Sequence, residues 1–225
     1  MSTSLPPRTA QSLYERAQAL SGLRLGQLAH EFGVAVPADL RRHKGWIGRL
    51  LEDLLGADGG NAPAADFSHL GIELKSIPVN RRGRPLESTF VCTAPLAAPD
   101  ETTWQTSQAR SKLKRVLWIP ILTDRQAPVA ERMVGSPLLW SPSPRQEKLL
   151  ARDWREHVDV IRRGYVDEIT AHDGEILQIR PKGASADSRT WSIGPQGQSI
   201  LTLPRAFYLR ARFTRTLLEE HFAIA

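Results

Sequence analysis

The spacing of the apolar residues changes along this chain, and that change constrains the fold more than any other feature. Up to residue 56, apolar residues recur at intervals of three and four, which places them on one face of an α-helix. From Ile72 to Leu122 they alternate or form short continuous runs, as β-strands do. Helices, then a central group of strands, then mixed elements predict a mixed α/β fold whose central mixed sheet is flanked by helices.

The predicted elements can be given by their ranges. Helices are expected over Thr9–Leu20, Leu23–Phe32, Asp39–Gly56, Thr106–Leu113, Glu147–Arg163 and Phe213–Phe222. Strands are expected over Ile72–Val79, Thr89–Ala94, Arg115–Leu122, Val134–Trp140, Ile176–Arg180 and Ile200–Leu203. The Gly- and Ser-rich segment Gly183–Gln198 is expected to be a mobile loop. The 225 residues suit one domain, or one core with a smaller lobe.

Several classes of protein are disfavoured. The longest apolar run, Val116–Leu122, is far shorter than the ~18 residues of a membrane-spanning helix, and no secretory signal opens the chain. Cys92, the single cysteine, forms no intrachain disulfide and fits a reducing compartment, so we expect a cytoplasmic protein without a membrane partner. The sequence contains no P-loop, GxGxxG, HExxH or CxxC motif, so a partner would have to supply any ATPase activity.

The positive charge of the chain is concentrated near its C-terminus. The net charge is +6, and the stretch from residue 180 to 215 contains one acid, Asp187. Its basic residues are Arg180, Lys182, Arg189, Arg205, Arg210, Arg212 and Arg215. A second cluster contains Arg110, Lys112, Lys114 and Arg115. Localised positive charge suits a polyanion, although a solvated basic face fits the charge equally well; interleaved aromatic residues such as Tyr208 favour nucleic acid.

A small set of polar residues has the spacing of a hydrolytic site. Glu73 and Lys75 share one face of the predicted strand, ~6.6 Å apart, and Asp66 lies in the loop that enters this strand. Two converging carboxylates, with the backbone carbonyl of Leu74, would suit Mg²⁺. Lys75 could then orient the attacking water and stabilise the charge that develops on a scissile phosphate.

The same Glu-x-Lys pattern also fits a surface ion pair, which contributes ~0–1 kcal/mol. Three further features favour a site. Asp66 precedes Glu73 at a suitable distance, and Glu52 lies on the polar face of the preceding helix, one turn after Gly48. Lys112 and Lys114 come just before the apolar strand and could bring another cation to the same edge.

The arrangement of Asp66, Glu73 and Lys75 after a helical Glu52 resembles the PD-(D/E)xK nucleases, and longer segments resemble the MutH family of mismatch repair endonucleases. These segments are KGWIG (Lys44–Gly48), LGIELKSIPV (Leu70–Val79), GRPLESTFVC (Gly83–Cys92), KLKRVLWIP (Lys112–Pro120), GSPLLWSP (Gly135–Pro142), LQIRPK (Leu177–Lys182) and ILTLPRAFYLR (Ile200–Arg210). The resemblance implies a restriction-endonuclease-like domain over 1–225. Its N-terminal lobe would be catalytic, its basic lobe from about residue 134 would recognise DNA, and the DNA would lie in a cleft between them.

The resemblance also assigns roles to single residues. It implies Asp66 and Glu73 as metal-binding acids, Lys75 as the catalytic lysine, and Glu52 and Lys112 as further active-site residues. It implies that Lys44 and Phe90 contact DNA and that Arg180 and Tyr208 lie near the adenine whose methylation is sensed. From their place in the basic clusters, we expect these further residues to bind DNA: Lys114, Lys182, Arg205, Arg210 and Arg212.

The activity implied by the resemblance is Mg²⁺-dependent nicking of the unmethylated strand at hemimethylated GATC sites, 5′ to the G. The enzyme would act as a monomer and would be stimulated by the ATPase MutL downstream of MutS. Two alternatives stay open. One is a restriction-like endonuclease that cuts both strands of GATC, and the other is a basic DNA-binding domain without catalysis.

Overall fold

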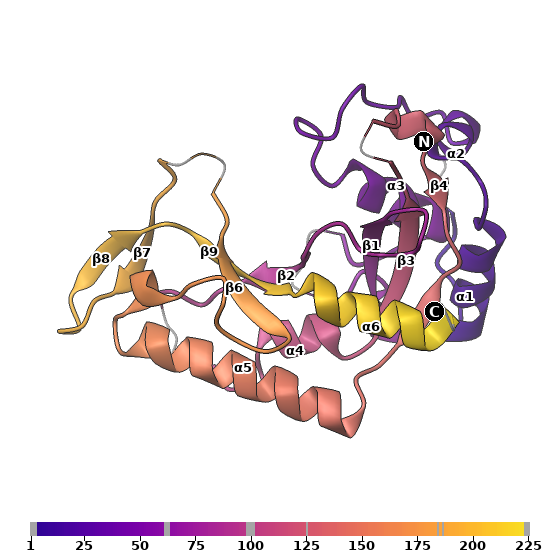
Figure 1. The fold of residues 1–225 in the computed structure, drawn as a ribbon. Helices are drawn as coiled ribbons and strands as arrows, with labels where there is room; N and C mark the ends of the chain where they lie inside the picture. Colours follow the sequence, from indigo (N-terminus) through magenta and orange to yellow (C-terminus); the bar gives the residue numbers. More distant parts are fainter. Residues whose placement is uncertain are drawn as a thin grey trace. The chain divides into compact units, whose positions relative to one another are not determined.

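The chain forms two compact units, each assembled from separate stretches of sequence (Figure 1). The computed structural model describes residues 4–60, 64–97, 102–124, 126–183, 185 and 187–222. The first unit comprises Met1–Glu87, Lys114–Ser141 and Arg215–Ala225, and the second comprises Ser88–Leu113 and Pro142–Thr214. Of the basic lobe expected from about residue 134, Pro142–Thr214 falls in the second unit, whereas residues 134–141 and 215–225 fall in the first. The division into a catalytic and a DNA-recognising lobe stays a prediction.

A mixed sheet forms the centre of the first unit. Strands β1 (Glu73–Val79) and β3 (Val116–Leu122) run parallel, with Glu73 opposite Val116. On the other side of β3, β4 (Met133–Val134) and β5 (Leu138–Trp140) pair antiparallel to its two ends. All but the last residue of β3 are buried, which explains why this strand has a continuous apolar sequence. The predicted mixed sheet is confirmed, but the strand expected at Val134–Trp140 is interrupted at Gly135, Ser136 and Pro137.

Helices α1 (Ala10–Ala19), α2 (Leu25–Glu31) and α3 (Trp46–Leu55) pack apolar side chains into the core of this unit. The prediction that the third helix begins at Asp39 is wrong. The Asp39 carboxylate accepts hydrogen bonds from the N–H groups of Arg41 and Arg42, which forms a turn instead. Gly45 then adopts a positive φ of 85°, and the helix begins only after it.

The second unit contains a three-stranded antiparallel sheet in the order β2–β9–β6 and a separate hairpin. The strands are β2 (Thr89–Thr93), β6 (Leu177–Pro181) and β9 (Arg205–Leu209), and the hairpin is β7 (Thr190–Ile193) with β8 (Ser199–Thr202). Sequence analysis missed β9, which lies in the centre of this sheet. It also assigned β7 to a loop; Ala184 and Ala186 of that expected loop lie outside the described residues.

Three further helices occur in the described part of the chain. They are α4 (Gln108–Leu113), α5 (Pro144–Arg162) and α6 (Ala211–Phe222). Helix α5 starts earlier than predicted because Ser143 and Gln146 form a capping box, with Pro144 in the first turn. Short 3₁₀ turns occur at Ser68–Leu70, Val129–Glu131 and Val166–Glu168. Within the described ranges, no helix has the length and apolarity required to cross a bilayer.

Candidate functional site

Glu73 and Lys75 form a buried ion pair at the start of β1. The Lys75 Nζ lies 2.9 Å from Glu73 Oε1, and the two side chains are only 11% and 5% exposed. The intervening Leu74 belongs to the hydrophobic core, as the alternation of the strand predicts. A surface ion pair was the alternative interpretation, and this burial excludes it. Removing two charges from water costs several kcal/mol, so this buried pair is not expected to add much to the stability of the fold. Its burial is better explained by a chemical role.

The Asp66 side chain folds back onto the same strand. One of its carboxylate oxygens accepts a hydrogen bond from the Leu74 N–H at 2.8 Å. The Asp66 backbone is also held, because its carbonyl oxygen accepts bonds from the N–H groups of Asp58 and Gly59 at 3.0 and 2.9 Å. A Cβ atom on Gly59 would lie 2.3 Å from the Ala65 carbonyl oxygen, so this close approach requires glycine. Asp66 is therefore fixed next to Glu73 by both its backbone and its side chain.

Glu52 adds a third carboxylate from α3. Its pKa is raised, first by burial and then by the negative charges of Asp66, Asp53 and Glu73, with Arg49 opposing the shift. This repulsion indicates a region of concentrated negative charge, which a divalent cation would relieve. Across the described residues, no group of three or more His, Cys, Asp and Glu side chains is arranged to hold a metal by itself. The donors for a cation would be Asp66, Glu73 and the Leu74 carbonyl, all hard oxygen ligands suited to Mg²⁺.

Replacing Glu52 with Gln is expected to stabilise the protein in Mg²⁺-free buffer. An acid whose pKa is raised by folding costs stability in its ionised form, so the gain is present at pH 7 and disappears below the ordinary Glu pKa of 4.5. We expect the Tm to rise by roughly 1–4 °C at pH 7, measured by calorimetry. An equal rise at pH 4 would show that the gain is unrelated to the charge of Glu52.

Four of the predicted DNA-binding side chains meet on the sheet of the second unit. Phe90 on β2 and Tyr208 on β9 are cross-strand partners, with ring centroids 5.6 Å apart and an interplanar angle of 71°. The Lys182 ammonium lies 3.1 Å from the Phe90 ring centroid, and the Arg180 guanidinium lies 6.0 Å from that of Tyr208. Aromatic faces combined with cations provide both stacking surface and charge for a nucleic acid.

Three other predicted DNA-binding arginines make hydrogen bonds within the second unit. Arg205 is 7% exposed and bonds the Asp167 carboxylate at 3.0 Å. Arg210 donates to the carbonyls of Asp173 and Gly174, and Arg212 donates to the Glu175 carbonyl. These contacts stabilise the segment that leads into β6, which is a structural role that the charge pattern alone did not reveal. Their contact with DNA stays a prediction.

The three remaining lysines predicted to act at the active site or on DNA are divided between the two units. Lys44 precedes α3 in the first unit, Lys112 lies on α4 in the second, and Lys114 starts the stretch of the first unit that contains β3.

Asp153 and His157 are two buried polar residues that sequence analysis missed. Asp153 is 0% exposed, and its carboxylate accepts bonds from the Ile176 and Leu177 N–H groups at 2.7 and 2.9 Å. Burial raises the pKa of Asp153, but these backbone bonds outweigh it and the net pKa is lowered. His157 Nε2 lies 3.1 Å from the Leu177 carbonyl oxygen. Both residues lie on the buried face of α5, where the helical periodicity predicts apolar residues. Two polar residues at such positions are the sequence signal that could have identified them.

Comparison with known proteins identifies the family. Residues 55–153 match the family model described as DNA mismatch repair enzyme MutH, a range that includes Asp66, Glu73 and Lys75. The chain is 54% identical over 219 residues to the DNA mismatch repair protein MutH of Serratia proteamaculans, covering 97% of this chain and 96% of that protein. The corresponding proteins of Photorhabdus laumondii and Citrobacter koseri are 54% and 55% identical, each over 97% of this chain and covering 96% and 95% of those proteins.

These matches, together with a mixed α/β fold, define a DNA mismatch repair endonuclease. More narrowly, the chain belongs to the MutH family, which confirms the predicted restriction-endonuclease-like fold class.

Proposed function

We propose that this endonuclease nicks the unmethylated strand of hemimethylated GATC sites, immediately 5′ to the G, by Mg²⁺-dependent phosphodiester hydrolysis. The products would be a 5′ phosphate and a 3′ hydroxyl. The observation that carries this proposal is the cluster of buried Glu73 with half-buried Asp66 and Lys75, and with Glu52 close enough to have its pKa raised by both acids. A protein that only binds DNA gains nothing from a buried concentration of negative charge.

The proposed mechanism assigns a separate task to each side chain. Bound Mg²⁺ would supply Lewis-acid activation and neutralise charge on the scissile phosphate. Asp66 and Glu73 would hold that cation, and the fixed backbone of Asp66 keeps one ligand in place before the substrate arrives. The Lys75 ammonium, already held 2.9 Å from Glu73, would orient the attacking water and stabilise the developing negative charge. Lys112 would add a second cation near the reacting phosphate.

Methylation would be read by the aromatic and cationic cluster on the second unit. A methyl group on adenine N6 projects into the major groove, where it removes a hydrogen-bond donor and adds bulk. Tyr208 is partly exposed and packs edge-on against Phe90, so its ring is held in one orientation and would exclude that bulk. Arg180 and Lys182 would contact the bases or the sugar-phosphate backbone of the same GATC site.

The partners follow from the proposed reaction. One set of catalytic residues in a chain suits a monomer that cuts one strand at a time. We propose that it works in the cytoplasm on duplex DNA, with MutL as its activator and MutS acting upstream.

A strand-resolved nicking assay tests the proposed function. The substrates are matched plasmids with GATC unmethylated, hemimethylated on either strand, or fully methylated, each with and without Mg²⁺, MutL and ATP. We expect single-strand cuts on the unmethylated strand only, which require Mg²⁺ and increase with MutL. Cutting of both strands of hemimethylated DNA would support a restriction enzyme, and binding without cutting would support the silent DNA-binding domain.

A further inference from the structure

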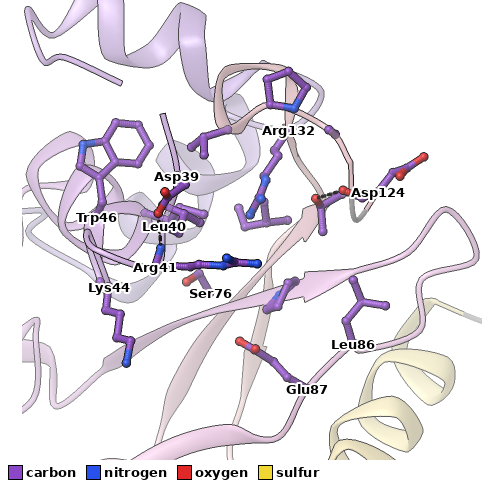
Figure 2. A pocket seen from close by; sticks show the side chains of 18 of the residues that line it. Asp39, Leu40, Arg41, Lys44, Trp46, Ser76, Leu86, Glu87, Asp124 and Arg132 are labelled. Carbon is purple, nitrogen blue, oxygen red and sulfur yellow. Dashed lines mark hydrogen bonds between the residues drawn. The ribbon is translucent and has the colours of Figure 1, made fainter. Parts of the chain in front are cut away.

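A hollow in the first unit lies between the segment that precedes α3 and the strands β1 and β3 (Figure 2). Its volume is about 1120 Å³, which is large enough for a nucleotide-sized group. Ser76 and Pro78 of β1 line one wall, and the segment around Val129 lines another. None of the residues implied in catalysis lines this pocket.

Three cations line the pocket: Arg41, Lys44 and Arg132. Figure 2 shows the side chains of Arg41 and Arg132 both reaching into it. Among the described residues, the side chains of Arg41, Lys44 and Arg132 make no ion pair and donate no hydrogen bond. The Arg132 Nε atom is buried and has no hydrogen-bond partner within that part of the chain. Leaving such a buried donor unsatisfied is unfavourable, and across the described ranges no acceptor meets it.

The acids around the pocket do not supply that acceptor. The Asp39 carboxylate accepts hydrogen bonds from the backbone N–H groups of Arg41 and Arg42. The Asp124 carboxylate accepts one from the Gln126 N–H, so both acids stabilise local turns. Glu87 lines the pocket as well and offsets part of the positive charge. The remaining feature is a pair of guanidinium groups directed into one space, an arrangement that matches the oxygens of a phosphate.

We propose that this pocket binds a backbone phosphate of the DNA substrate, with Arg41 and Arg132 as its ligands. The proposal rests on the proposed function, because it takes the ligand to be DNA. The pocket adjoins the catalytic acids within the same unit, since Gly48 lines it and a Cβ atom there would lie 3.7 Å from Glu52 Oε1. A phosphate held here would belong to the strand being cut and would position the scissile bond. Arg41 and Arg132 are therefore positioning residues.

The test replaces Arg41 with Gln and Arg132 with Gln in separate variants, with Arg42→Gln as the matched control. Arg42 is the exposed neighbour of Arg41 and does not line the pocket. DNA affinity is measured against salt concentration, and then on duplexes that carry one neutral methylphosphonate at each position around GATC. Arg41 is exposed, so its substitution leaves the fold intact even if the change at Arg132 does not.

We expect each pocket variant to bind about tenfold more weakly and to reduce the salt slope by ~0.9, as one lost phosphate contact does. One methylphosphonate position should weaken the wild type and the Arg42→Gln variant equally. It should weaken Arg41→Gln by a smaller factor, because only Arg132 then remains to contact that phosphate. Unchanged slopes, or a methylphosphonate profile identical in all proteins, would overturn the proposal. If inorganic phosphate raises the Tm of the wild type and not of Arg41→Gln while DNA affinities match, the pocket takes a free anion, and the DNA assignment is wrong.

Nicking by the wild type, measured in parallel, keeps the two proposals separate. If the wild type nicks normally and the Arg41 and Arg132 variants bind DNA as the wild type does, only the phosphate-binding role of the pocket is rejected. Absence of nicking by the wild type with a position-specific phosphate effect would reject only the proposed reaction.

Discussion

Glu73→Gln and Lys75→Met are each expected to lower the nicking rate by about 10³-fold or more while DNA affinity changes by less than about threefold. Glu73 would lose its charge as a cation ligand, and Lys75 would lose the ammonium that orients the attacking water. Neither change alters the aromatic and cationic surface on the second unit. The measurements are single-turnover nicking and equilibrium binding on the same hemimethylated duplex.

Each of these substitutions also removes one charge of a pair whose two side chains are only 11% and 5% exposed, so a loss of stability is expected as well. The double variant Glu73→Gln/Lys75→Met removes both charges and separates the catalytic effect from the loss of stability. Glu31→Gln, an exposed acid in the same unit, is the control for loss of one carboxylate. The catalytic assignment is wrong if either single variant retains nicking within about tenfold of the wild type.

Asp153→Ala is expected to destabilise the protein by roughly 3 kcal/mol, which lowers the Tm by about 6–12 °C in a chain of this size. The substitution leaves the buried N–H groups of Ile176 and Leu177 without their acceptor at the start of β6. Glu156→Ala on the same helix is the control, because that side chain is 61% exposed and its ion pair with Arg152 is long, at 3.8 Å. Urea unfolding of both variants provides the measurement, and equal losses of stability would contradict this account.

Two buried residues of α5, Asp153 and His157, each contribute to the pH dependence of stability. Burial lowers the pKa of His157 below 6.5, so the unfolded chain binds the proton first and stability declines as pH falls through about 6.5. The lowered pKa of Asp153 adds stability above its ordinary value of 3.8, and this contribution is lost at lower pH as the native carboxylate is protonated. His157→Gln should remove the first decline and keep the second.

Local sequence patterns were sufficient to predict the strand that contains Glu73 and Lys75. The alternation from Ile72 to Val79 places Glu73 and Lys75 on one face and Leu74 in the core, because strand periodicity is fixed by backbone geometry. The position of Asp66 followed from its place in the loop entering that strand. The burial of the ion pair was not predictable, since it depends on packing between elements distant in sequence.

The architecture of the second unit depends on such distant pairings. Strand β9 lies between β2 and β6, so its neighbours come from separate parts of the chain, and its five residues follow Pro204 with no clear alternation. Arg205 was predicted to bind DNA from its charge alone, whereas its guanidinium is buried against Asp167. Charge counts report how many cations a segment contains, and only the fold determines which of them are engaged internally.

The most direct test of the central claim is to locate the metal ion in crystals of the wild type and of Glu73→Gln, each with DNA that carries a non-hydrolysable linkage at the scissile position and with Mn²⁺ in place of Mg²⁺. We expect an anomalous peak about 2.1 Å from carboxylate oxygens of both Asp66 and Glu73 in the wild type, and a weak peak or none in the variant. A peak bound elsewhere, or one that persists unchanged without the Glu73 carboxylate, would contradict that claim.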